Sequence, residues 1–333
     1  MIRIMKYTIV TVTTLIVGCQ SVVDIEVPLD PPSLVVNGTV ESNGQWRFSV
    51  GKSMHILDLT NSMSVEEDGN VLMIRTINSS TEINKPVRYD NASIVVYKDD
   101  QELYRIPSIG EGKYFFHASP LEMSAEYSMK ISVPGIKSVQ AVSTLPLLPE
   151  IINFSFDTTY SEFYPRGGVN SVDTRSVKLV FVDDPGTKNF YMVSAEMFMP
   201  LDKYYSPDQI IQEGDSAWYP LKLQTEDAIL EDDIDQNDYF SWNQLFFDDT
   251  LINGKMYTLN FGLSAVRFYR LGNIRIIFSS ITEDAFLFIK TKNKQREAGK
   301  DPFSEPVNVH SNIENGYGIF YGIATDTLEI RIH

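Results

Sequence analysis

The sequence is poor in the residues that build disulfides and hold metals. Cys19 is the single cysteine among 333 residues, so the chain cannot form an internal disulfide. None of the four histidines lies at the short spacing found in zinc-binding helices or fingers. We therefore expect no zinc site, and no motif assigns a cofactor.

Positive charge is also scarce. The chain carries 28 lysine and arginine residues against 44 aspartate and glutamate residues, which gives a net charge of −16. Such an acidic chain is repelled by nucleic acid and by anionic lipid surfaces. We expect no nucleic-acid partner, and the charge favours solubility at the outer face of a cell.

Long apolar runs are missing. The uncharged stretch Tyr7–Val17 is far shorter than the ~20 residues that a membrane-spanning helix needs. It follows Arg3 and Lys6 and leads through Gly18 to Cys19, which is the pattern of a secretory signal with a small-residue cleavage site. We expect residues 1–18 to be a lipoprotein signal peptide.

Cys19 stands at the expected cleavage point, where a lone thiol is best explained as the acceptor of a lipid. A thioether-linked diacylglycerol and an amide-linked acyl chain such as palmitate anchor a protein more firmly than one acyl chain does. We expect residues 19–32 to be a lipid-anchored tether at the outer membrane, with the protein facing the cell exterior. The alternative is a secreted protein whose cysteine is incidental.

The region 33–148 is predicted to be an immunoglobulin-like β-sandwich. Apolar residues alternate with polar ones, which is typical of half-buried strands. Turn signals separate roughly seven short strands, the number found in such sandwiches. The stretch Lys52–Asn91 interrupts this rhythm and is interpreted as an excursion from one end. The alternating residues are Leu34, Val36, Trp46, Phe48, Val50, Tyr127, Met129, Ile131 and Val133.

The region 149–333 is predicted to be a second β-rich domain. The two prolines in Thr144–Pro149 make a stiff, extended junction. One amphipathic helix is expected between Ser280 and Gly299, because Ser280 and Glu283 have the spacing of a capping box and Gly299 is a stop signal. The mainly β fold is thus expected to contain this helix near its C-terminal end.

The stretch Asp301–Tyr321 is interpreted as a structural clasp. Its prolines cannot continue a helix, and Gly316 and Gly318 suit a tight path into a strand. His310 stands beside Ser311, but no GxSxG turn precedes them, so we favour a hydrogen-bonding role in a turn over catalysis.

The C-terminal part of the sequence also resembles that of a known protein family. A helix followed by DPFSEPVNVHSN, then GYGIFYG and a terminal strand, resembles the end of the Bacteroidota lipoproteins called domain-of-unknown-function family 4249, as does PSLVVNG at Pro32–Gly38. The resemblance covers nearly all of the mature chain. It implies a neighbouring TonB-dependent outer-membrane receptor and assigns no reaction.

An acidic segment offers a candidate for a metal site. Asp233, Asp235 and Asn237 alternate as the oxygen ligands of calcium loops do. The glycine and the closing glutamate of an EF-hand are absent, because Asp238 and Leu245 stand near those positions. A solvated acidic loop is favoured over a structural calcium site.

Aromatic residues gather in the segment 197–249. A buried core is the ordinary meaning of such residues, and an exposed subset would instead contact a sugar or a protein partner. The candidate contact residues are Trp218, Tyr219, Tyr239 and Trp242.

The leading functional hypothesis is a non-enzymatic lipoprotein that acts as an accessory subunit of a TonB-dependent transporter and assists substrate capture or nutrient uptake. A surface adhesion or structural module is the alternative. An enzyme is the third class, and no motif supports it.

Overall fold

A computed structural model describes residues 31–53, 63–68, 71–76, 87–163, 170–200, 216–230, 244–264, 273–299 and 304–331. Within these ranges the protein is built mainly of strands, with one helix near the C-terminal end, as the sequence predicts. The expected signal peptide and Cys19 lie outside them.

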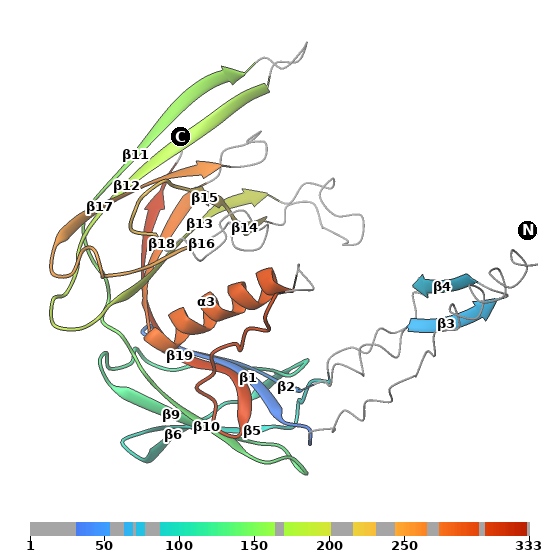
Figure 1. Ribbon diagram of the computed structural model, residues 1–333. Helices are drawn as coiled ribbons and strands as arrows, with labels where there is room; N and C mark the ends of the chain where they lie inside the picture. Colours follow the sequence, from blue (N-terminus) through green and yellow to red (C-terminus); the bar gives the residue numbers. More distant parts are fainter. Residues whose placement is uncertain are drawn as a thin grey trace, which may run out of the picture.

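A nine-stranded main sheet, counted over the described residues, runs through both halves of the molecule (Figure 1). Its strand order is β14-β13-β18-β19-β1-β2-β8-β7, and β16 pairs with β13 beside this path. The strands are β14 (Ser216–Pro220), β13 (Phe190–Pro200), β18 (Ile274–Ile281), β19 (Gly316–Ile330), β1 (Leu34–Glu41), β2 (Gln45–Lys52), β8 (Lys113–His117), β7 (Ser108–Gly110) and β16 (Gln244–Asp248).

A four-stranded sheet covers one end of the main sheet and completes the first sandwich. The alternating residues that the sequence marks as inward-facing are buried there. Trp46 and Tyr127 meet edge to face across the two sheets, with ring centroids 5.6 Å apart. The covering strands are β10 (Val139–Thr144), β9 (Glu126–Ser132), β5 (Ser93–Lys98) and β6 (Gln101–Arg105).

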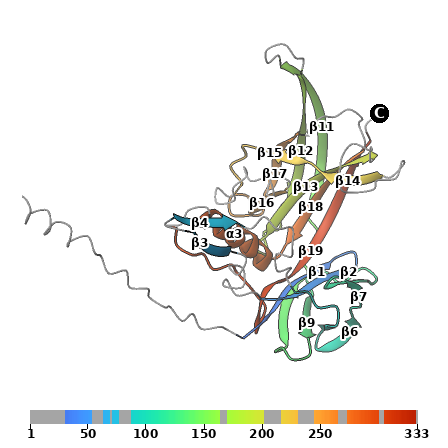
Figure 2. The ribbon, with the colours of Figure 1, turned by 90° about the vertical axis from the view of Figure 1, so that its right-hand side faces the viewer.

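A second four-stranded sheet packs on the other end of the main sheet. The core between them holds Leu179, Phe181, Phe247 and Phe278, all fully buried. The hairpin of β11 (Glu150–Phe163) and β12 (Asn170–Val182) projects beyond this second sandwich (Figure 2). The strands are β11 (Glu150–Phe163), β12 (Asn170–Val182), β17 (Met256–Ser264) and β15 (Lys222–Gln224).

The predicted excursion at Lys52–Asn91 contains a further hairpin. Its strands β3 (Met63–Asp68) and β4 (Val71–Thr76) pair only with each other among the described strands. The stretch is therefore a strand-bearing insertion between β2 and β5.

Strand β19 joins the two sandwiches by changing partner along its length. Its first part, Gly316–Ile323, runs parallel to β1, and its second part, Ile323–Ile330, runs antiparallel to β18. A segment near the C-terminal end thus supplies Phe320 to the core of the first sandwich. The domain boundary near residue 149 stays a prediction.

Helix α3 (Glu283–Ala298) lies against the face of the main sheet that points away from the second core. Phe286 packs on Phe190, with ring centroids 5.0 Å apart. The predicted cap at Ser280 is wrong: Thr282 is the N-cap and its hydroxyl accepts the Ala285 N–H at 3.4 Å. Ser280 instead belongs to β18, because pairing with β13 and β19 extends that strand to Ile281.

Candidate functional site

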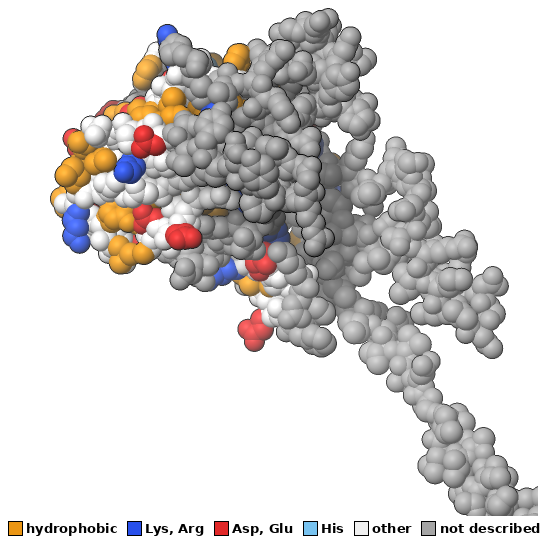
Figure 3. Space-filling view, turned by 90° about the horizontal axis from the view of Figure 1, so that it is seen from above, with side chains coloured by type: hydrophobic (Ala, Val, Ile, Leu, Met, Phe, Trp, Pro, Cys, Tyr) orange, Lys and Arg blue, Asp and Glu red, His pale blue; other side chains and the backbone are white. Residues whose placement is uncertain are grey.

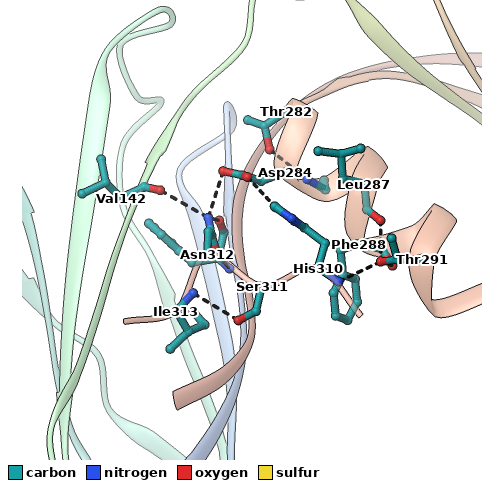
Figure 4. A network of polar contacts seen from close by, with 12 residues as sticks. Val142, Thr282, Asp284, Leu287, Phe288, Thr291, His310, Ser311, Asn312 and Ile313 are labelled. Carbon is teal, nitrogen blue, oxygen red and sulfur yellow. Dashed lines mark hydrogen bonds and ion pairs between the residues drawn. The ribbon is translucent and has the colours of Figure 1, made fainter. Parts of the chain in front are cut away.

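The segment around His310 is bound to α3 (Figure 4). The His310 Nε2 atom lies 2.7 Å from Asp284 Oδ1, and the His310 backbone N–H donates to Thr291 Oγ1 at 2.8 Å. The Thr291 hydroxyl in turn donates to the Leu287 carbonyl at 2.7 Å. Both helix residues are thus used to hold the chain that follows the helix.

The Asn312 side chain makes the backbone hydrogen bonds that a neighbouring strand would otherwise make. Its Oδ1 accepts the Phe320 N–H at 2.9 Å and its Nδ2 donates to the Phe320 carbonyl at 2.7 Å. The same nitrogen lies 3.2 Å from Asp284 Oδ2 and 3.3 Å from the Val142 carbonyl, so these longer contacts share its two hydrogens. One side chain therefore satisfies both backbone groups of Phe320 on the edge of β19 that faces away from β1.

Two further contacts bind this segment to β10. The Ser143 hydroxyl accepts the Gly322 N–H at 3.0 Å, and the Glu314 backbone N–H donates to the Gln140 carbonyl at 2.8 Å. Because buried backbone groups without partners are costly, these contacts stabilise the first part of β19. We call the contacts of residues 310–322 with α3 and β10 the clasp.

The glycines of the clasp are required by close approach. A Cβ on Gly318 would lie 1.9 Å from the Val36 carbonyl oxygen, and the residue has φ +108°. A Cβ on Gly316 would lie 2.7 Å from the Leu34 carbonyl oxygen, and one on Gly322 would lie 2.1 Å from that of Thr144. Only glycine allows the strands to pack this closely.

The clasp has the geometry of a structural element. The Ser311 hydroxyl accepts the Ile313 N–H at 3.3 Å, and within the described residues no hydrogen bond joins Ser311 to His310. A nucleophile and its base must be in hydrogen-bond reach of each other. These contacts agree with the favoured hydrogen-bonding role of His310, but residues 305–313 form an irregular segment rather than a turn.

A second set of side chains forms what we call the aromatic patch: Glu196, Phe198, Trp218 and Arg275. Phe198 pairs with Trp218 across β13 and β14, and Glu196 pairs with Arg275 across β13 and β18. The four side chains therefore stand on one face of the main sheet.

The four side chains of the aromatic patch contact one another. The Arg275 Nε donates to Glu196 Oε2 at 2.6 Å, and its guanidinium lies 4.2 Å from the centre of the Trp218 ring. The Phe198 and Trp218 rings are 5.3 Å apart. Phe198 is 37% exposed and Trp218 is half-buried, so apolar and charged surface meet there. Seen from above, the described surface likewise mixes hydrophobic, acidic and basic side chains (Figure 3).

The side chains of the other predicted contact and metal residues lie outside the part of the chain that the structure describes. Tyr219 lies in β14, where its backbone alone is described. Tyr239 and Trp242 lie outside the described residues, as do the calcium candidates Asp233, Asp235 and Asn237. In the part of the chain that the structure covers, no cluster of histidine, cysteine and acidic side chains could hold a metal ion.

The second sandwich also contains a buried polar network that was not predicted from the sequence. The Tyr191 hydroxyl donates to Asp183 Oδ1 at 2.7 Å, and the Gly254 N–H donates to Asp183 Oδ2 at 2.8 Å. Asp249 accepts the Asn189 N–H at 2.8 Å. Burial raises the pKa of Tyr191, an effect increased by the bond to Asp183, so the phenol stays a donor. The run DDPGTKN at residues 183–189 was its available sequence signal.

A groove with a volume of about 670 Å³ lies beside α3 and was likewise not predicted from the sequence. It lies over the outward faces of β1, β2 and β8, between β19 with Phe288 on one side and β7 on the other. The groove brings β19 and α3 beside strands from the first half of the chain, so no local pattern could have revealed it.

The chain belongs to the family described as Domain of unknown function (DUF4249), whose model matches residues 20–329. The predicted family is therefore confirmed. No curated protein matches the chain. In the described ranges, no helix combines the length and the apolar character needed to cross a bilayer.

Proposed function

We propose that this protein is a non-enzymatic, lipid-anchored protein of the outer membrane that binds a TonB-dependent transporter and assists substrate capture or uptake. The anchor is the predicted lipid on Cys19, and the type of partner comes from the family resemblance. Exposure of the protein at the cell surface belongs to the same proposal.

The observation that carries the proposal is the aromatic patch. Protein interfaces are enriched in tryptophan, phenylalanine and arginine, and their strongest contacts combine aromatic anchors with preorganised charges. Trp218 and Phe198 supply apolar area, while the bond to Glu196 and the stacking on Trp218 hold the guanidinium of Arg275 in place. A partner that covers this patch gains contact area without having to order these side chains.

The anchor is tested by Cys19→Ser. We expect the variant to lose its lipid and to leave the membrane fraction, because nothing else is proposed to hold it there. The measurement is fractionation after a carbonate wash. A variant that still sediments with outer membrane would refute the anchor.

The partner is tested by affinity capture from detergent-solubilised outer membrane. We expect a TonB-dependent receptor in stoichiometric amount from the unmodified protein, and at least about tenfold weaker binding with Trp218→Ala, as for a central aromatic contact. The control is Tyr317→Ala, which removes a 56% exposed aromatic side chain from β19. Capture without a receptor would favour the adhesion or structural alternative.

A further inference from the structure

The groove beside α3 has a regular construction that follows from strand register. Tyr321, Thr39, Arg47 and Phe115 stand in one row across β19, β1, β2 and β8. The neighbouring row contains Ile319, Asn37, Ser49 and Lys113. Each row begins with an apolar side chain on β19 and reaches polar side chains on the central strands.

The walls of the groove are apolar. Ile319, Tyr321 and Ile323 form one wall together with Phe288 of α3, and Ile109 and Phe115 stand on the opposite side. A volume of about 670 Å³ lies within the range of roughly 300–1,000 Å³ for small-molecule sites. The groove is thus large enough for the apolar body of a small ligand.

The floor of the groove is polar and open to a ligand. Within the described residues, the side chains of Asn37, Thr39 and Ser49 form no hydrogen bond. Sites that bind small molecules combine apolar walls with a few such polar groups, which orient the ligand. Other polar side chains of the fold, such as Asn312 in the clasp, are by contrast fully used by the protein itself.

Two cationic side chains line the groove. Its charged lining residues are Arg47, Lys113 and Glu41, in a chain of net charge −16. The Arg47 guanidinium donates to Glu41 and to Gln45, and Lys113 lies 3.4 Å from Glu111. These are exposed contacts, which are weak and which an entering anion can replace. An anionic ligand that displaces these carboxylates would find the donors of Arg47 and Lys113 within reach.

We propose that this groove binds a small anionic amphiphile, whose apolar body lies along the β19 wall and whose carboxylate or phosphate group contacts Arg47. The bidentate geometry of a guanidinium suits both anions. The site is separate from the aromatic patch, so it does not rest on the proposed transporter partner.

Calorimetric titration of the full-length chain carrying Cys19→Ser tests the proposal, with decanoate as the probe and decyltrimethylammonium as a probe of equal chain length and opposite charge. We expect decanoate to bind and the cation to bind at least about tenfold more weakly. No binding of decanoate, or equal binding of the two probes, would overturn the proposal.

Paired variants locate the site. Arg47→Gln should weaken decanoate binding at least about tenfold, whereas Arg105→Gln, which removes another exposed arginine paired with a glutamate, should not. Ser49→Trp should abolish binding by filling the groove, and Ser128→Trp, at a similarly half-buried strand position on the opposite sheet, should retain it. Equal effects within either pair, among variants that melt as the parent does, would contradict the assignment.

Vesicles of phosphatidylglycerol distinguish a soluble ligand from a lipid headgroup in a membrane. We expect the protein to bind monomeric decanoate without binding the vesicles. Arg47-dependent binding to vesicles without binding to decanoate would make this face a membrane contact and would refute the small-molecule site.

Discussion

The two faces of strand β19 serve different purposes. Gly318, Phe320 and Gly322 turn toward the first sandwich, where Phe320 is buried and both glycines touch neighbouring backbone. Ile319 and Tyr321 turn the other way and line the groove beside α3. One face is closed by the first sandwich, and the other forms an apolar wall of the groove, where Ile319 is buried and Tyr321 packs against the cluster around Phe286.

The difference separates stability from binding. On the inward face, Asn312 and Ser143 satisfy backbone groups of β19, and no space remains for a side chain on Gly318. On the outward face, the polar floor beside Tyr321 is available to a ligand. Substitutions on the inward face should therefore destabilise the protein, while those of the polar floor residues should change binding with little loss of stability.

Gly318→Ala is the strongest test of this contrast. The new methyl group would meet the Val36 carbonyl oxygen at 1.9 Å, in a backbone conformation with φ +108° that alanine disfavours. We expect the free energy of unfolding to fall by roughly 2–5 kcal/mol, which combines left-handed backbone strain with overpacking. Denaturation with urea would measure it.

Gly135→Ala is the matched control for that substitution. Gly135 also has positive φ, at +82°, but a Cβ there would meet nothing within 4 Å. Gly135→Ala should lower the free energy of unfolding only by backbone strain, which is roughly 1–2 kcal/mol. Equal losses for the two variants would mean that the close approach of β19 to β1 does not matter.

Asn312→Ala tests the side chain that bonds to the backbone of Phe320 on the open edge of β19. It removes both hydrogen bonds to the Phe320 backbone and leaves these groups without their partner. We expect a loss of roughly 1–3 kcal/mol in the free energy of unfolding. Asn260→Ala, at an exposed position where the amide donates to Thr258 at 3.3 Å, should cost less. A reversed order would argue against the clasp.

The sequence predicts the local parts of this arrangement well. Alternation at Trp46, Phe48 and Val50 correctly marks buried strand residues, because side chains on a strand point to opposite faces in turn. Gly299 correctly marks the end of α3. These signals are local, and the structure preserves them.

The sequence does not predict which strands become neighbours. The pairing of β1 with β19 joins Leu34 to Gly316, and no turn or motif marks such a distant partner. The groove depends on this register, so it stayed hidden. The misplaced helix cap at Ser280 has the same cause, since pairing within the main sheet overrides the local capping pattern.

His310→Ala should have a smaller effect than either clasp substitution above. The imidazole is half-buried, and its bond to Asp284 lies where water can replace it. We expect a loss of about 0.5–1.5 kcal/mol in the free energy of unfolding, with binding of decanoate and of the transporter unchanged. Loss of either binding activity at unchanged stability would make this stretch a site.

Tyr321→Phe carries the smallest expected effect and examines the outward face alone. Burial raises the pKa of Tyr321, and the nearby Arg47 offsets part of this rise. A group whose pKa is higher in the folded state adds stability that is present below its ordinary pKa, about 10 for tyrosine, and is lost as the pH rises through the folded value.

At pH 7 the phenol is neutral in both the folded and the unfolded state, so Tyr321→Phe should leave the urea midpoint nearly unchanged. Above pH 10 the unfolded wild-type chain releases this proton before the folded protein does, which favours unfolding. The variant should therefore lose less stability than the wild type between pH 10 and higher values. Tyr317→Phe, which removes an exposed phenol from the same face of β19, is the matched control. A midpoint that falls at pH 7 in Tyr321→Phe would show that the outward face, too, holds the fold together, and the contrast between the two faces of the strand would be lost.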